Sequence, residues 1–186
     1  MLKFILLVTS ALVLQGCAAL FVGGVATGVA MVNDRRPAGV VLEDEAIESR
    51  AMLAVKSTFG NRVHVNITSY NRNVLISGEA LDEATRAGVE RTLRLASPSV
   101  KTVYNEMTVG ELASFMAVSH DSGVTAKVKG RYIDAGKFNI AQVKVVTEQG
   151  IVYLFGLVTQ QEAADAVEIA RTTSGVKKVV RLFEYL

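Results

Sequence analysis

Apolar and polar residues alternate along two pairs of short stretches, and the second pair repeats the first. Val65-Asn66-Ile67-Thr68-Ser69-Tyr70 is followed by Val74-Leu75-Ile76-Ser77-Gly78. Further along the chain, Val143-Lys144-Val145-Val146-Thr147-Glu148 is followed by Val152-Tyr153-Leu154-Phe155-Gly156. A period of two, rich in β-branched and aromatic residues, indicates strands with one buried face. The pattern therefore predicts four strands, in two similar pairs.

Short polar segments join the two strands of each pair. They are Tyr70-Asn71-Arg72-Asn73 in the first pair and Glu148-Gln149-Gly150 in the second. Segments of this composition form tight turns, so each pair is predicted to be a hairpin. Gly78 and Gly156 end the second strand of each pair, and we interpret them as requirements of backbone geometry rather than as ligand sites.

A helical period precedes and follows each predicted hairpin. The helices that follow span Glu83–Ala96 and Gln161–Thr172, and closing strands begin near Val100 and Val176. The expected apolar faces of the leading helices are Ile47, Ala51, Ala54, Val55 and Val124, Val128, Tyr132, Ala135. Those of the following helices are Ala84, Ala87, Leu93, with Leu95 nearby, and Ala163, Ala166, Val167, Ala170. The chain thus predicts two α+β units of order αββαβ, each with helices on one side of a small sheet.

The amino-terminal stretch has the pattern of a secretory signal that ends in a lipobox. Lys3 provides a positive start, Phe4–Leu14 is apolar, and Leu14-Gln15-Gly16-Cys17 contains the one cysteine of the chain. We expect residues 1–16 to be removed and Cys17 to carry acyl chains, which hold a protein on a bilayer without a spanning helix. Ala18 follows the cysteine where inner-membrane retention usually needs Asp, which indicates the outer membrane. The alternative is that Cys17 is a buried residue of an uncleaved anchor helix.

The residues behind the cysteine are small and apolar. Ala18–Val32 contains a GxxxG at Gly24–Gly28, the pattern of paired membrane helices. The stretch is shorter than the ~20 residues that cross the hydrocarbon layer, so we interpret it as a linker, with a spanning helix as the alternative. The expected organisation is a signal peptide (1–16), a lipidated amino terminus and linker (17–40), a first domain (41–110) and a second domain (111–186).

Composition and charge narrow the range of functions. The formal net charge is +2 and the cysteine count is 1. With acidic and basic residues nearly balanced, the chain lacks the strongly basic footprint of nucleic-acid binding. One cysteine, used for attachment, leaves none for a disulfide, a zinc site or a thiol nucleophile. These observations indicate a folded, tethered protein with no cofactor.

The repeated units resemble BON domains, and the whole chain is similar to the bacterial outer-membrane lipoproteins with two BON domains. The residues that carry the resemblance are Leu14–Cys17, Asp34-Arg35-Arg36 with Gly39 and Asp44, Gly78, Val103-Tyr104-Asn105-Glu106, Gly156-Leu157-Val158-Thr159 and Gly175-Val176-Lys177-Lys178-Val179. The resemblance implies a non-enzymatic, palmitate-bearing lipoprotein that faces the periplasm, binds anionic phospholipid, supports outer-membrane integrity and gathers at cell-division sites. It places the lipid contact on the first helix of the second domain.

The predicted helix from Ser122 to Lys137 carries residues that suit such a lipid contact. At about 100° per residue, Ile133 lies almost opposite Val124, the residue expected to face the sheet. An exposed isoleucine between cationic side chains is typical of a helix that contacts lipid headgroups. Gly123 departs from the family, which often has an aromatic residue there. The alternative is a solvated basic face. The candidate phospholipid-binding residues are Lys127, Lys129, Arg131, Ile133 and Lys137.

Candidate catalytic residues are few. His64 and His120 are the two histidines, and we expect His64 to be exposed on its strand and His120 to lie near the start of a helix. The acidic clusters Glu43-Asp44-Glu45 and Asp82-Glu83 are interpreted as charges at helix amino termini, where they complement the dipole. No Gly-x-Ser-x-Gly elbow, phosphate-binding glycine loop or metal-ligand spacing is present. We therefore expect neither a catalytic site nor a metal site.

A second function remains open beside lipid binding. The first domain has a basic helix face of Arg86, Arg91 and Arg94, which is either solvated or docks on outer-membrane assembly proteins. In that adaptor role the second domain would merely orient the first. The connector Gly110–His120 is short and partly apolar, so we expect the two domains to pack together. A hydrolytic enzyme is a distant third possibility, because its candidate residues are lacking.

Overall fold

The computed structural model describes residues 34–186, apart from the side chain of Phe115. The predicted signal peptide, Cys17 and the apolar linker lie outside these residues. Residues 35–186 form one compact unit. Within the described part of the chain, none of the helices combines the length and the apolar character that crossing a membrane requires.

The first repeat has the predicted order of elements and one addition. Its sheet has the order β1-β2-β3, with β1 and β2 antiparallel and β3 parallel to β2. A two-residue strand, β4, also pairs in parallel with β2, and the sequence did not predict it. The elements are α3 (Ala38–Phe59), η1 (Gly60–Arg62), β1 (Val63–Tyr70), β2 (Asn73–Ala80), α4 (Glu83–Ala96), β3 (Thr102–Asn105) and β4 (Thr108–Val109).

The second repeat follows the same plan. Its sheet has the order β5-β6-β7, again with an antiparallel hairpin and a parallel closing strand. The elements are α5 (Phe115–Ala135), η2 (Ile140–Gln142), β5 (Lys144–Glu148), β6 (Ile151–Val158), α6 (Gln160–Arg171) and β7 (Lys178–Tyr185). The predicted α+β class and the αββαβ order of both units are therefore confirmed.

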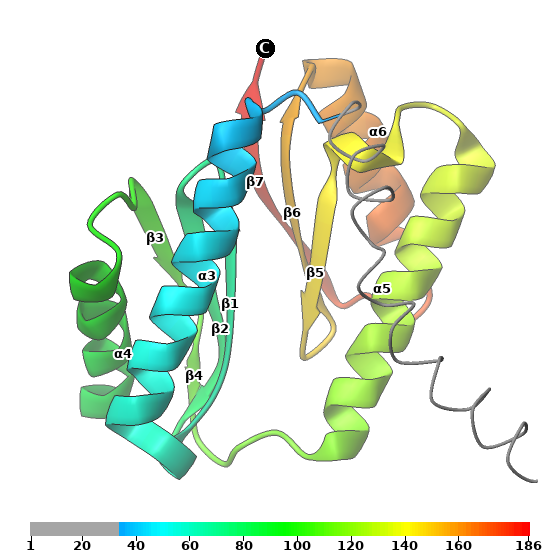
Figure 1. Ribbon diagram of the computed structural model, residues 1–186. Helices are drawn as coiled ribbons and strands as arrows, with labels where there is room; N and C mark the ends of the chain where they lie inside the picture. Colours follow the sequence, from blue (N-terminus) through cyan, green and yellow to red (C-terminus); the bar gives the residue numbers. More distant parts are fainter. Residues whose placement is uncertain (1–33) are drawn as a thin grey trace, which may run out of the picture. The chain divides into compact units, whose positions relative to one another are not determined.

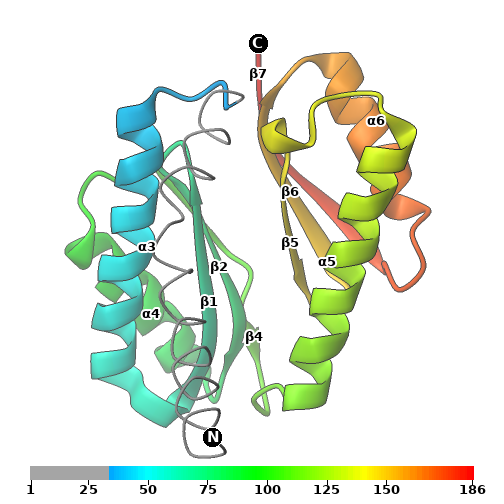
Figure 2. The same cartoon turned by 45° about the vertical axis from the view of Figure 1, so that its right-hand side comes forward.

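Three apolar clusters organise the unit into layers. One lies between α3, α4 and the first sheet, and another between α5, α6 and the second sheet. The third joins the opposite faces of the two sheets, where Tyr70 and Leu75 meet Val146, Tyr153 and Phe155. Each sheet thus has helices on one face and the other sheet on its second face (Figures 1 and 2). The two domains pack together as expected, although through their sheets rather than through the connector.

Both hairpin turns have left-handed backbones. Asn71 and Arg72 have φ of 51° and 66°, and Gln149 and Gly150 have φ of 52° and 77°. Two consecutive residues with positive φ match the right-handed twist of the strands that they join. Asparagine and glycine adopt this conformation most easily, which explains their place in the two turns.

Gly78 and Gly156 lie where their strands approach neighbouring backbone closely. A Cβ on Gly78, whose φ is +108°, would lie 2.1 Å from the carbonyl oxygen of His64 in β1. A Cβ on Gly156 would lie 2.5 Å from the carbonyl oxygen of Gln142. These contacts leave no room for a side chain. The interpretation of both glycines as backbone geometry is confirmed.

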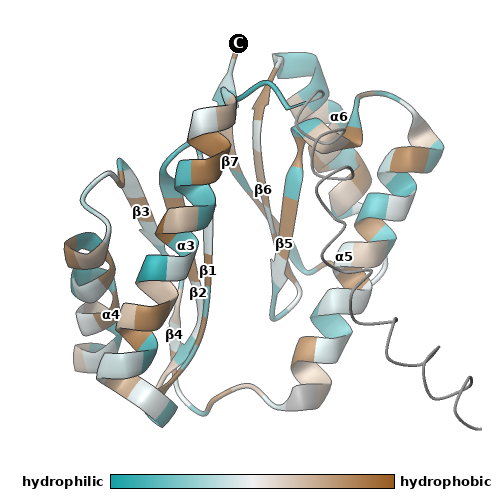
Figure 3. Ribbon diagram, viewed as in Figure 1, coloured by the Kyte–Doolittle hydropathy of each residue, from teal (hydrophilic) through white to brown (hydrophobic). Residues whose placement is uncertain are grey.

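The predicted buried face was wrong for most of α4 and largely right for α6. The bounds of α4 are as predicted, but its buried residues are Thr85, Val89 and Leu93, whereas Ala84, Ala87 and Leu95 are exposed. In α6 the buried residues include Ala163, Ala166 and Ala170 as predicted, together with Ile169. A helix with a single buried face has both polar and apolar residues along its length, as the mixed colours of α3 and α5 show in Figure 3. In α4, Ala84 and Ala87 were assigned to the buried face because they are apolar, and this placed the predicted face on the wrong side of the helix.

Helix α5 begins within the predicted connector. Ser114 caps it, with a side chain that accepts a hydrogen bond from the backbone N–H of Ala117. The connector predicted up to His120 is therefore shorter, and His120 lies inside the helix rather than at its start. At the other end, Ala135 is exposed although it was assigned to the buried face. Gly136, in the left-handed conformation with φ 59°, ends the helix.

Candidate functional site

Helix α5 buries one side and presents cationic and apolar residues on the other. Val124, Val128 and Tyr132 are buried against the second sheet, as the sequence predicted. Lys127 and Lys129 are exposed, and Ile133 leaves 66% of its area open to solvent. Neither lysine forms an ion pair or hydrogen bond with another residue in the range 34–186. We call Lys127, Lys129 and Ile133 the α5 surface.

The other two predicted cations are held by α6. Nη1 of Arg131 donates to the carbonyl oxygen of Ile169 at 2.8 Å and to Oγ1 of Thr173 at 2.8 Å. The guanidinium therefore satisfies a carbonyl in the last turn of α6, where positive charge also complements the helix dipole. Nζ of Lys137 lies 2.6 Å from Oδ1 of Asp165. The structure thus separates the predicted set into an open group and a group engaged with α6.

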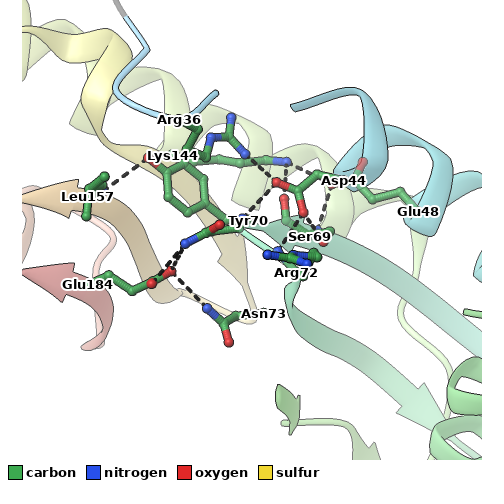
Figure 4. Close-up of polar contacts among 11 residues, drawn as sticks. Arg36, Asp44, Glu48, Ser69, Tyr70, Arg72, Asn73, Lys144, Leu157 and Glu184 are labelled. Atoms are coloured by element: carbon green, nitrogen blue, oxygen red, sulfur yellow. Dashed lines mark hydrogen bonds and ion pairs between the residues drawn. The ribbon is translucent and has the colours of Figure 1, made fainter. Parts of the chain in front are cut away.

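A buried carboxylate organises the end of the first repeat near its hairpin turn. Asp44, 3% exposed, accepts hydrogen bonds from Oγ of Ser69 at 2.6 Å and from the backbone N–H groups of Asn71 at 2.7 Å and Arg72 at 2.8 Å (Figure 4). Nη1 of Arg36 adds an ion pair at 2.6 Å. The predicted dipole role of Asp44 is wrong, because α3 begins well before this residue and its first turn has no acidic side chain.

The same end joins the two repeats. The guanidinium of Arg36 lies 3.9 Å from the ring centroid of Tyr70, whose hydroxyl accepts a hydrogen bond from the N–H of Leu157 at 3.1 Å. Nζ of Lys144 pairs with Oε1 of Glu48 at 2.8 Å (Figure 4). Further bonds of 2.9 Å run from Asn71 and Asn73 to Glu184. These contacts connect the two repeats structurally, and the residues named here form no catalytic arrangement.

Arg35 makes a second connection from the segment before α3. Its guanidinium donates to both carboxylate oxygens of Glu162, at 2.7 and 2.8 Å, and to the carbonyl oxygen of Leu157 at 3.0 Å. The bond from Arg35 is the main cause that lowers the pKa of Glu162 to about 2. Glu162 also closes a capping box with Thr159 at the start of α6. The Arg-Arg pair at 35–36 thus attaches the leading segment to both repeats.

Comparison with protein families identifies the repeats. The family model described as "BON domain" matches residues 43–111 and again residues 120–186. The chain belongs to the BON-domain family. Within it, the chain is a member of the outer-membrane lipoproteins with two BON domains, as the relatives below indicate.

The similarity to one curated relative extends over nearly the whole chain. The chain is 36% identical to the outer membrane lipoprotein DolP of Haemophilus influenzae, over 99% of this chain and 96% of that protein. It is 32% identical to the 21 kDa hemolysin of Actinobacillus pleuropneumoniae, over 82% of this chain and 79% of that protein. The osmotically-inducible protein Y of Escherichia coli is 33% identical over 40% of this chain and 36% of its own length. The BON-domain lipoproteins are not a known family of enzymes.

The second BON domain repeats the turn contact of the first. Asp121 on α5 is buried and accepts hydrogen bonds from the N–H groups of Gln149 at 2.6 Å and Gly150 at 2.9 Å. It corresponds to Asp44, because each carboxylate binds the left-handed turn of the hairpin that follows its helix. The sequence pattern did not predict this role. Aligning the leading helices, with Ile47 opposite Val124, would have placed Asp44 opposite Asp121, whereas alignment of the hairpins places it opposite Ser122.

His64 is less exposed than the sequence predicted. It faces the second BON domain, and its Nδ1 lies 2.9 Å from the carboxylate of Glu79, the residue opposite it on β2. Glu148, at the end of β5, lies beside this pair. Burial is the main cause that raises the pKa of Glu148, and the nearby Glu79 adds to the increase. The sequence predicted no metal-ligand spacing, yet the fold gathers three side chains of ligand type.

Proposed function

We propose that this BON-domain protein is a lipid-anchored lipoprotein of the outer membrane that faces the periplasm and contacts anionic phospholipid through the α5 surface. The exposed Ile133, one turn beyond the exposed Lys129 on α5, is the observation that supports it most directly, and Lys127 adds a further exposed cation on the same helix. Apolar side chains that enter the headgroup layer and ammonium groups that meet phosphates act together on such surfaces. The protein acts by occupying the membrane surface rather than by turnover, and so supports envelope integrity, including at division sites.

The contacts of the five candidate residues favour a direct lipid contact by three of them. Arg131 and Lys137 already bind partners on α6, so moving them to a phosphate group would cost those contacts. Lys127 and Lys129 would give up no such contact among residues 34–186. Gly123 and Gly130 leave open space on α5, which lets the helix approach a flat surface closely. We therefore assign the direct contact to Lys127, Lys129 and Ile133, with Arg131 and Lys137 in a supporting role.

Vesicle binding tests the α5 surface. A version without residues 1–33, whose folding is checked by circular dichroism, is sedimented with phosphatidylglycerol-containing or neutral phosphatidylcholine vesicles. We expect preference for anionic vesicles. Lys129→Glu combined with Ile133→Glu should weaken binding roughly 10- to 100-fold, since each reversed charge near an anionic surface changes the energy by about 1–2 kcal/mol and the apolar insertion is also lost.

The first BON domain offers a matched control. Arg91 and Leu95 on α4 have the same spacing as Lys129 and Ile133, both are exposed, and Leu95 leaves 77% of its area open. Arg91→Glu with Leu95→Glu should leave vesicle binding unchanged. Equal sedimentation with both kinds of vesicle, or an equal loss in both double variants, would contradict the proposed lipid contact.

The anchor is tested separately at the cysteine. We expect mass analysis of the mature protein to show Cys17 as the first residue, bearing two or three acyl chains. Cys17→Ser should abolish acylation, so the same mass analysis should find no species that carries two or three acyl chains. An unmodified wild-type amino terminus would refute the tether.

An adaptor function is the second candidate, and the exposed pair on α4 favours it. Arg86 bonds to Glu83, and Arg94 bonds to Glu90, so Arg91 is the cation of this predicted face that has no bond of its own within residues 34–186. Beside it, Leu95 is strongly exposed. If the Arg91/Leu95 variant disturbs the envelope in cells while the Lys129/Ile133 variant does not, the adaptor function is the better explanation.

A further inference from the structure

Three side chains from three strands meet where the two BON domains adjoin. His64 on β1, Glu79 on β2 and Glu148 on β5 each offer a ligand atom, and these atoms lie within 4.8 Å of one another. His64 and Glu79 are direct partners in the antiparallel register of β1 and β2. Glu148 comes from the second domain and reaches the same point. The cluster therefore combines an imidazole nitrogen with two carboxylates across a domain boundary.

The two carboxylates are buried without a full complement of positive charge. Glu79 is 2% exposed and Glu148 is 9% exposed. Among residues 34–186, Glu148 forms no ion pair, and Glu79 forms one with His64. That pair carries opposite charges only when the imidazole is protonated. Two carboxylates at close range in a poorly hydrated place repel one another and favour either a shared proton or a bound cation.

Neighbouring groups hold both carboxylates by hydrogen bonds, and a cavity connects the cluster to solvent. Glu79 accepts hydrogen bonds from Nε2 of Gln149 and from the N–H of Ala113, and Oγ of Ser77 donates to Glu148 at 3.2 Å. Outer contacts of this kind fix the orientation of metal ligands. His64 and Glu148 also line a cavity of about 470 Å³ beside α5, which is open to solvent.

We propose that His64, Glu79 and Glu148 bind one divalent cation of the zinc class. An imidazole with two carboxylates suits zinc and its neighbours in the transition series, whereas calcium and magnesium prefer oxygen ligands alone. Ligand atoms around zinc at about 2.0–2.2 Å lie roughly 3.3 Å apart. The widest separation in the cluster, up to 4.8 Å, therefore shortens on binding, and the 2.9 Å contact between Nδ1 of His64 and the Glu79 carboxylate opens slightly. Water from the cavity supplies the fourth ligand. The ion links β1 and β2 of the first domain to β5 of the second, a function that does not depend on lipid binding.

The two histidines provide the test. The full-length protein in detergent is stripped of metal with a chelator and titrated with Zn²⁺ by calorimetry, then with Co²⁺, whose visible absorption reports nitrogen and oxygen ligands. We expect one ion per chain and a higher melting temperature with Zn²⁺. His64→Asn and Glu148→Gln should each lower the affinity by at least roughly tenfold. His120→Asn, which replaces the other, exposed histidine, should bind as the wild type does.

Several outcomes would overturn the site. These are no Zn²⁺ binding by the wild type between pH 6 and 8, undiminished binding by His64→Asn, or loss of binding in His120→Asn. Equal competition by Ca²⁺ or Mg²⁺ would likewise reject an imidazole-containing site. His64 is partly exposed, so its replacement by the similarly sized asparagine keeps the fold testable by circular dichroism even if Glu148→Gln unfolds the protein.

Discussion

Replacing Asp44 by alanine is expected to lower the free energy of unfolding by about 3–5 kcal/mol, the cost of breaking a buried ion pair on one side. The substitution removes a carboxylate that pairs with the guanidinium of Arg36, and it removes the acceptor for the N–H groups of Asn71 and Arg72. Unpaired buried donors add to the loss. Urea unfolding followed by circular dichroism measures it.

Two comparisons make this prediction specific. Asp121→Ala should cost less than Asp44→Ala, because Asp121 accepts two backbone bonds at its turn but, among residues 34–186, pairs with no arginine. Asp134→Ala, at an exposed position on α5, should change stability by no more than about 0.5 kcal/mol. If Asp44→Ala were as mild as Asp134→Ala, the cluster around Asp44 would not hold the first domain together.

Gly78→Ala is the second substitution with a large expected effect, a loss of about 2–5 kcal/mol. A new Cβ would lie 2.1 Å from the carbonyl oxygen of His64, and the φ of +108° at this position is unfavourable for any side chain. Backbone strain and overpacking each contribute about 1–3 kcal/mol. The strands β1 and β2 would have to separate where they pair, and thermal or urea unfolding would report the change.

The same substitution at another glycine should have the opposite sign. Gly123 lies inside α5 with no atom near the place that a Cβ would occupy. Gly123→Ala should therefore stabilise the protein by about 0.5–1 kcal/mol, the usual gain from replacing glycine within an exposed helix. A neutral Gly78→Ala would mean that β1 and β2 are less closely spaced than the structure shows.

Much of the local structure was predictable because it depends on periods within short segments. The alternation at Val65 and Ile67 and the polar turn at Asn71 predicted the first hairpin. The similar segment later in the chain predicted the second. The phase of α4 was harder, because Ala84 and Ala87 are apolar yet too short to fill the core, whereas Thr85 packs despite its hydroxyl. Apolar character alone therefore chose the wrong face.

Contacts between distant segments were not predictable in the same way. Nothing local distinguishes Asp44 from its acidic neighbours, since its importance comes from the turn that it binds. His64, Glu79 and Glu148 meet only because the two sheets pack face to face, and the position of one sheet on the other is a tertiary property. The α5 surface was found because its residues share one helix, although the α6 contacts of Arg131 and Lys137 were not apparent.

The face-to-face packing of the sheets has a consequence for how the protein meets its environment. Helices α5 and α6 form one outer layer of the unit, and α3 and α4 form the opposite outer layer. When α5 rests on a bilayer, α3 and α4 are turned away from it toward the aqueous space. Lipid adhesion and recruitment of a partner would then be simultaneous rather than competing events, and each could be removed by mutation without disturbing the other.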